Sequence, residues 1–202
     1  AVIYFNFETD FGQEDPEKIC ISRLREAKRD GYERIYDWHQ EDYKKVYGTM
    51  SFQLESQDYS EIPMDQLLSR YREEDVRRYL TQVLFAFGRY LLIGASWNCR
   101  LPANLQGIWC GSFTPKWESK YTININLEMN YWMVDSCGLS ECFQPFMNLL
   151  EKMVENGKST AREIYGCHGS VAHHNTDCYG DTDLEGLPPS AYMWPMGEAW
   201  LS

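Results

Sequence analysis

The chain has 202 residues, of which 44% are hydrophobic and 24% are charged, and its formal net charge is −11. This composition is ordinary for a folded globular protein and unlike that of a disordered one. An acidic balance of this size repels phosphate backbones, so we expect no nucleic-acid partner and favour neutral ligands.

No apolar stretch reaches the roughly 18 residues of a membrane span, since Gly88 and Arg89 interrupt the longest candidate, residues 83–95. We therefore expect no membrane partner. The seven cysteines include no Cys-x-x-Cys pair, which favours scattered reduced thiols. The N-terminus lacks an initiator Met and the layout of a signal peptide, so it reads as a start within a longer chain and leaves the compartment open.

The first predicted element is a short strand over residues 2–7, followed by a break at Gly12 to Asp15. We interpret residues 1–12 as the tail of a preceding β-domain or a linker, and residues 13–202 as the main domain. A helix is then predicted from Pro16, with Asp15 as its cap and Asp30-Gly31 as its end.

Four further helices are predicted, over residues 34–47, 75–95, 140–157 and 193–201, with a loop over 166–189. The second half of the helix over 75–95 is apolar nearly all round. Such a helix must be enclosed by neighbours, which indicates packed helix layers larger than a simple bundle.

The segment from Tyr121 to Asn126 carries the most informative polar spacing. If it is extended, Thr122, Asn124 and Asn126 share one face, opposite the two isoleucines. Asn126 can then cap a following helix and place Glu128 in its first turn. The alternative is that these asparagines only satisfy turns and caps.

Five motifs in order resemble glycoside hydrolase family 95: Gly88–Ile93, Leu101–Trp109, Tyr121–Trp132, Val171–Asp177 and Met193–Gly197. The resemblance implies an all-α fold, here an incomplete (α/α)6 barrel (a helical toroid) whose first half is residues 13–202. It also implies a preceding β-domain, which would account for a residual strand at the N-terminus.

Members of that family are inverting α-L-fucosidases or act on α-L-galactosides. The resemblance implies that Asn124 and Asn126 hold the attacking water, polarised by an Asp further along the chain. A downstream Glu would be the general acid, so this chain would need the remainder of its own catalytic domain. The implied partner is a fucosylated oligosaccharide or glycan, with no cofactor and no metal.

The resemblance also implies a substrate-binding group made of Thr122, Glu128, His173, His174 and Trp194. Thr122 would lie near C5 and C6 of the sugar. Because a threonine can hydrogen-bond a 6-hydroxyl, L-galactose stays open beside fucose.

Three alternatives compete with this interpretation. Glu128 can be a general acid, although a helix dipole should lower its pKa, the wrong direction for donating a proton. A metal site can form from histidines and neighbours, though their spacing matches no familiar zinc pattern: His173, His174 and Asp177, joined by Cys167, His168 or Cys178. The chain can also be a non-catalytic remnant that binds sugar weakly or assembles with other chains.

Overall fold

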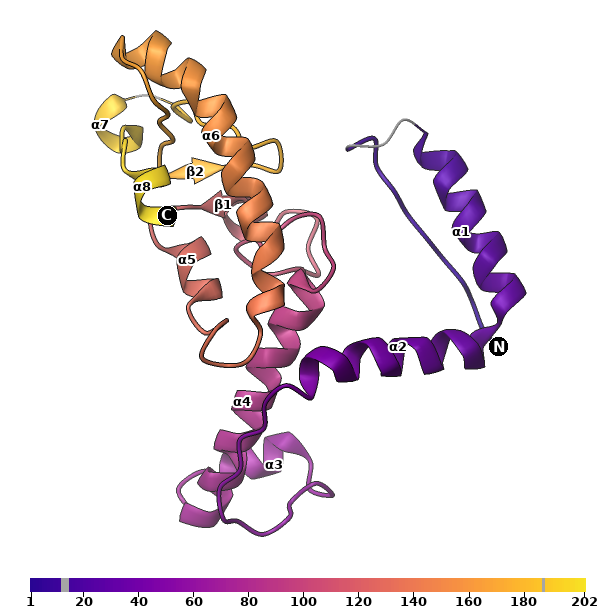
Figure 1. Cartoon of the computed structure of the whole chain (residues 1–202). Coiled ribbons are helices and arrows are strands. Elements are labelled where there is room, and N and C mark those ends of the chain that lie inside the picture. The colour runs from indigo at the N-terminus through magenta and orange to yellow at the C-terminus, as the bar shows by residue number, and fades with distance from the viewer. Residues whose placement is uncertain (12–14, 187) are drawn as a thin grey trace. The chain divides into compact units, whose positions relative to one another are not determined.

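The computed structural model describes residues 1–11, 15–186 and 188–202, and it is predominantly helical (Figure 1). Two compact units divide the chain, residues 1–48 and residues 49–202, and each is described by itself. In the described part of the chain, no helix is both long enough and apolar enough to cross a membrane.

The first unit contains α1 (Pro16–Asp30) and α2 (Tyr32–Tyr47), as the sequence predicts. The Asp15 side chain accepts a hydrogen bond from the Lys18 backbone N–H at 2.9 Å, which satisfies a donor that the first turn leaves open. Gly31 separates the two helices, and its N–H donates to the Ala27 carbonyl.

The predicted N-terminal strand is wrong. Residues 1–9 carry no strand, and the sheet of the described residues consists of two other segments. A strand needs a neighbour to accept and donate its backbone hydrogen bonds, and the side chains of Val2, Ile3, Phe5 and Phe7 are 56–83% exposed rather than packed against one. The predicted break at residues 12–14, with the domain boundary beside it, lies outside the described residues.

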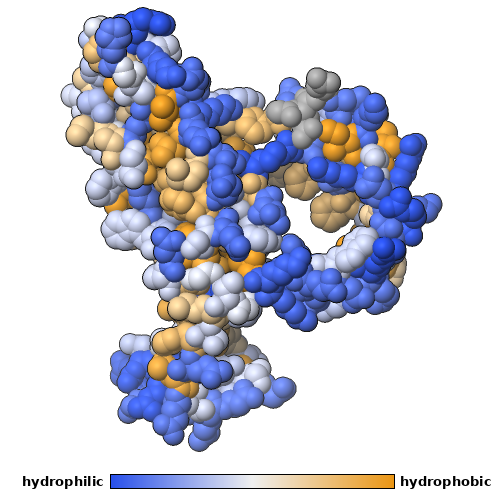
Figure 2. Space-filling model, in the orientation of Figure 1, coloured by the Kyte–Doolittle hydropathy of each residue, from blue (hydrophilic) through white to orange (hydrophobic). Residues whose placement is uncertain are grey.

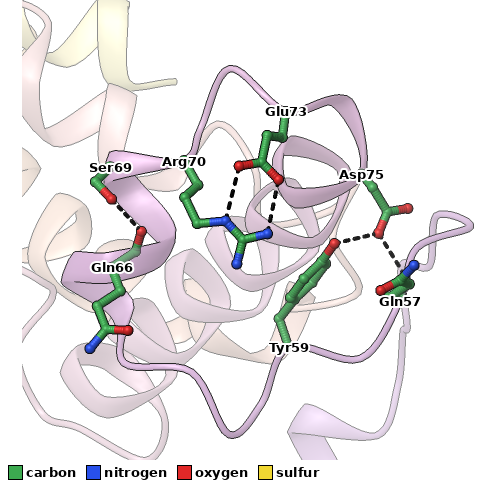
Figure 3. Close-up of polar contacts among 7 residues, drawn as sticks. All are labelled: Gln57, Tyr59, Gln66, Ser69, Arg70, Glu73 and Asp75. Carbon is green, nitrogen blue, oxygen red and sulfur yellow. Dashed lines mark hydrogen bonds and ion pairs between the residues drawn. The ribbon is translucent and has the colours of Figure 1, made fainter.

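The second unit begins with α3 (Met64–Ser69), which the sequence analysis missed, and α4 (Glu74–Ser96), which confirms the helix predicted over 75–95. Tyr59, Leu67 and Val76 form a small core between them. Figure 3 shows the polar contacts that hold this corner: Arg70 forms a two-pronged ion pair with Glu73.

Asp75, at the start of α4, ties the preceding segment to the helix. Its carboxylate accepts hydrogen bonds from the Gln57 backbone N–H at 3.0 Å and the Tyr59 hydroxyl at 2.8 Å (Figure 3). These bonds, that from Gln57 first, lower the pKa of Asp75 below its ordinary value.

The predicted enclosure of α4 is incomplete within the second unit. Arg89 is 2% exposed, and its guanidinium donates to the carbonyls of Cys137 and Met50. Leu84 and Phe87, however, are 70% and 53% exposed and line an apolar cavity of about 500 Å³ beside α3. Figure 2 shows hydrophobic surface over this stretch of α4.

The helix predicted from Ser140 is present, but its predicted end at Asn156-Gly157 is wrong. A 3-10 turn, η2 (Ser140–Phe143), leads into α6 (Gln144–Tyr165), which ends at Gly166 with φ 62°. Gly157 lies inside this helix, at a position where a Cβ would collide with Ser170 Oγ and would meet the Val171 carbonyl at 2.8 Å. It permits a close approach rather than a helix end.

The remaining elements are short: η1 (Lys116–Ser119), β1 (Tyr121–Thr122), α5 (Asn126–Tyr131), β2 (Asn175–Thr176), α7 (Pro189–Tyr192) and α8 (Gly197–Leu201). The helix predicted over 193–201 thus begins only at Gly197. The elements of the second unit support the helical fold class, and closure into a toroid stays a prediction.

Candidate functional site

The two strands bring the candidate segments together. β1 pairs antiparallel with β2, with Tyr121 opposite Thr176 and Thr122 opposite Asn175. The next backbone N–H, of Ile123, donates to the His174 carbonyl at 2.7 Å. Because the Ile123 side chain is fully buried, this junction is anchored in the core and fixes where the following turn begins.

Asn124 and Asn126 follow this junction, and both are exposed. The expected extended segment ends after Thr122, since residues 123–125 form a turn and Asn126 is the first residue of α5. Ile125 therefore does not share the buried face of Ile123, and it is 39% exposed. Ile125, not Asn126, occupies the cap position, so the predicted capping role of Asn126 is wrong.

A polar cluster lies beside the sheet, around Glu185. One carboxylate oxygen forms an ion pair with Lys120, and the other accepts a hydrogen bond from the Asn175 side chain. The Asn175 amide also donates to His174 Nε2 at 2.7 Å, while His174 Nδ1 donates to the Tyr192 carbonyl at 3.3 Å. His174 Nε2 also lies 3.8 Å from the second Glu185 carboxylate oxygen, so the histidine belongs to this cluster.

Glu185 and Lys120 are the functional candidates that sequence reasoning missed. Burial raises the pKa of Glu185, but the hydrogen bonds from Lys120 and Asn175 outweigh it, so the pKa is lowered overall. Glu185 is therefore an anion near neutral pH and holds both strands from the outside. No motif marks it, because Lys120 lies 65 positions away in the chain.

His173 lies in the interior, 1% exposed. Its Nδ1 donates to the Thr182 carbonyl at 2.9 Å, and its Nε2 accepts from the Tyr165 hydroxyl at 2.8 Å. Both ring nitrogens are therefore engaged within the protein, so neither is free for a metal or a sugar. Across the described ranges, no group of three or more His, Cys, Asp or Glu side chains could hold a metal ion.

Glu128 is the third residue of α5, and its predicted lowered pKa is wrong. The residue is 7% exposed, and neither carboxylate oxygen has a hydrogen-bond partner among the described residues. Burial raises its pKa to about 7, while its own backbone N–H acts in the opposite direction. Desolvation of the carboxyl group therefore decides the direction of the pKa shift.

Thr122 and Trp194 are both half-buried. Thr122 lies in β1, and Trp194 lies in the connection between α7 and α8, two residues after the Tyr192 carbonyl that binds His174. The structure thus gathers Thr122, Asn124 and His174 around the sheet, with Trp194 on an adjoining segment. Glu128 is turned away from them into the interior.

Comparison with known families gives this arrangement a context. The sequence profile of the glycosyl hydrolase family 95 catalytic domain matches residues 31–202. The chain belongs to glycosyl hydrolase family 95.

Three named relatives are similar to this chain over most of its length. The chain is 34% identical over 191 residues to Alpha-L-fucosidase 2 of Arabidopsis thaliana. The aligned region covers 93% of this chain and 23% of that protein. It is 33% identical over 195 residues to Probable alpha-fucosidase A of Aspergillus niger, covering 95% and 24%. The protein of the same name in Aspergillus oryzae is 33% identical over 180 residues, covering 85% and 24%. The chain spans about a quarter of the length of these relatives.

The family 95 match includes every candidate residue, from Thr122 to Trp194, and the elements from α2 to α8. It begins inside the first compact unit, at Gly31, so α1 lies before it. The second unit, with its small sheet, is therefore the part in which a family 95 function is to be sought.

Proposed function

We propose that this chain supplies the water-positioning part of an inverting glycosidase that releases terminal α-L-fucose from glycans. The observation that carries the proposal is the pair Asn124 and Asn126. Both residues are exposed, Asn124 in the turn after the buried Ile123 and Asn126 at the start of α5. The names of the family 95 relatives support fucose as the sugar.

Inversion needs an acid that protonates the leaving oxygen and a base that activates water on the other ring face, roughly 6.5–9.5 Å apart. A carboxamide can donate to and accept from a water but cannot take its proton. In this proposal Asn124 and Asn126 orient the water. An Asp and a Glu in the remainder of the catalytic domain accept and donate the protons.

Thr122 and His174 are proposed to bind the sugar, with Trp194 as an apolar wall. His174 Nε2 already receives the Asn175 amide, so a sugar hydroxyl would share or displace that bond. His173 is proposed to support the loop from the interior, because its two ring bonds join α6 to residue Thr182.

The test is product stereochemistry in the complete protein that contains this chain. With an aryl α-L-fucoside, NMR should show β-L-fucose as the first product, before mutarotation. An α-L first product would refute inversion, and no release of fucose would refute the function. The same assay with an aryl α-L-galactoside decides between the two sugars, since faster release of L-galactose would establish the alternative specificity.

A further inference from the structure

A cavity of about 270 Å³ lies beside α5. Its lining residues come from α5 and the turns that follow it, from η2, from the start of α6 and from α8. These elements are drawn close together in Figure 1. Aromatic rings make most of the wall, among them Trp132, Phe143, Phe146 and Trp200. Trp132 and Trp200 are 64% and 49% exposed, so their ring faces are accessible from solvent.

Glu128 is a buried polar residue that lines this cavity. It is 93% buried, from an exposed fraction of 7%, and both of its carboxyl oxygens lack a hydrogen bond among the described residues. Burying a carboxyl group without hydrogen-bond partners lowers the stability of a protein, so such a group rarely stays without a partner. The cavity beside it has room for a small molecule that provides the missing hydrogen bonds.

Two other polar side chains of the cavity have partners within the chain. Asp135 accepts a hydrogen bond from Ser140 at 2.9 Å. The Tyr131 hydroxyl is hydrogen-bonded to Ser96 at 2.6 Å and accepts from the Ala103 N–H at 2.8 Å. Glu128 differs from these two groups because it is buried and neither of its oxygens has a partner among the described residues.

We infer that this cavity binds a single sugar ring, with the Glu128 carboxyl hydrogen-bonded to ring hydroxyls and Trp200 against the apolar ring face. A carboxylic acid can donate through its O–H and accept through its C=O, which matches a pair of neighbouring hydroxyls. Burial, which raises the pKa of Glu128 to about 7, favours this neutral form. A flat aromatic face completes the amphipathic surface that a sugar presents.

This sugar site is separate from the one around Asn124 and Asn126. Two positions along an α-helix turn the side chain by about 200°, so Asn126 and Glu128 project from opposite sides of α5. Their exposures agree, since Asn126 is exposed and Glu128 is buried. The cavity fits polyhydroxy ligands in general, and the choice of a sugar among them rests on the proposed function.

The experiment is a titration of the complete protein with L-fucose and D-galactose, followed by saturation-transfer NMR, with methylammonium as a cationic comparator. We expect Glu128→Leu and Trp200→Ala to weaken one sugar-binding event at least tenfold. Glu128→Gln, which keeps a donor and an acceptor, should stay within threefold of the unsubstituted protein. Glu163→Leu, at an exposed position on α6, is the matched control and should change nothing.

Three results would overturn the inference. The first is an unchanged sugar affinity in Glu128→Leu, and the second is tighter binding of methylammonium than of sugar. The third is loss of the fold in Glu128→Gln, which would mean that Glu128 pairs with another part of the protein. If the protein hydrolyses the fucoside but its sugar binding does not depend on Glu128, only this inference is refuted. If sugar binding depends on Glu128 but the protein hydrolyses no fucoside, only the proposed function is refuted.

Discussion

At the scale of single residues, the candidate site depends on which polar groups are satisfied inside the chain. His173 and His174 are adjacent and similar in sequence, yet the first has both nitrogens bonded in the interior and the second lies beside the sheet. Glu128 and Glu185 differ in the same way. Glu185 has a cation and an amide as partners, and Glu128 has none among the described residues.

Glu185 is expected to act as a positioning residue. Glu185→Gln removes the ion pair with Lys120 while keeping the size of the side chain. The two strands then lose the charged contact that links Lys120 to Asn175 through Glu185. Because the pair is partly exposed, we expect a stability change below about 1 kcal/mol but a fall in kcat of about tenfold. Steady-state kinetics on an aryl α-L-fucoside measure it.

The control for Glu185 is Glu163→Gln, since Glu163 pairs with Arg162 where both side chains are at least 70% exposed. It should leave kcat unchanged. Equal kinetics in the two variants would remove Glu185 from the site, as would a fall in kcat explained by unfolding.

The buried Glu128 predicts how stability depends on pH. Its folded-state pKa is about 7 against an ordinary 4.5, so the folded state holds the proton more tightly. The stability contribution of this group should therefore fall as pH rises from about 4.5 to 7 and stay low above it. Glu128→Gln does not titrate, so it should be the more stable protein at pH 8, by at most about 3 kcal/mol at about 1.4 kcal/mol per pH unit.

Thermal unfolding of the ligand-free complete protein at pH 5 and pH 8 measures this difference. Asp135 and Tyr131 face the same cavity, and Asp135→Asn separates the contribution of the second carboxyl. A Tm difference between Glu128→Gln and the unsubstituted protein that is equal at both pH values would contradict the assignment.

At the scale of elements, close backbone approaches fix the site more than side-chain pattern does. The start of α8 lies against the segment before β2, and a Cβ on Gly197 would meet the Ala172 and His173 carbonyls at 2.7 and 2.8 Å. Backbone atoms cannot rotate away from such a contact. The short α8 can therefore pack beside the sheet only because residue 197 has no side chain.

Gly197→Ala should destabilise the protein by about 1–3 kcal/mol, because the new methyl group must displace backbone. The matched control is Gly88→Ala in α4, where a Cβ meets nothing within 4 Å of the described residues. Alanine is the better helix former, so that change should be neutral or stabilise by up to about 1 kcal/mol. Differential scanning calorimetry compares them, and a more stable Gly197→Ala protein would refute the close approach.

The sequence predicted α1, α2 and α4 well, and it predicted poorly the features that depend on contacts with distant segments. The helical spacing of α1, α2 and α4 follows from their own residues, and all three lie within two residues of the prediction. The strand over residues 2–7, the extended segment over 121–126 and the helix end at Gly157 failed. Each of these depends on a contact with a distant segment, which local periodicity does not contain.

The candidate site shows the same limit. The motif around Asn124 and Asn126 is local, and the sequence indicated it directly. The strand pairing and the contact of Glu185 with Lys120 join segments about 50 to 65 residues apart. The interior position of His173 and the lack of partners for Glu128 depend on tertiary packing, which the local pattern does not contain. Desolvation is the clearest case, because it reversed the direction of the pKa shift expected for Glu128.

At the scale of the whole molecule, this family 95 chain spans about a quarter of its relatives' length. In our proposal the water is held here and the protons move elsewhere. The large exposed apolar side chains of α4, Leu84 and Phe87, are consistent with further protein packing on this unit.

The most direct test of the central claim is kcat of the complete protein carrying Asn124→Ala or Asn126→Ala, with an aryl α-L-fucoside as substrate. If these amides orient the attacking water, each variant should lose at least about 100-fold in kcat with little change in Tm. Asn148→Ala, an exposed asparagine on α6, should lose nothing. Wild-type kcat in both Asn124→Ala and Asn126→Ala would contradict the account.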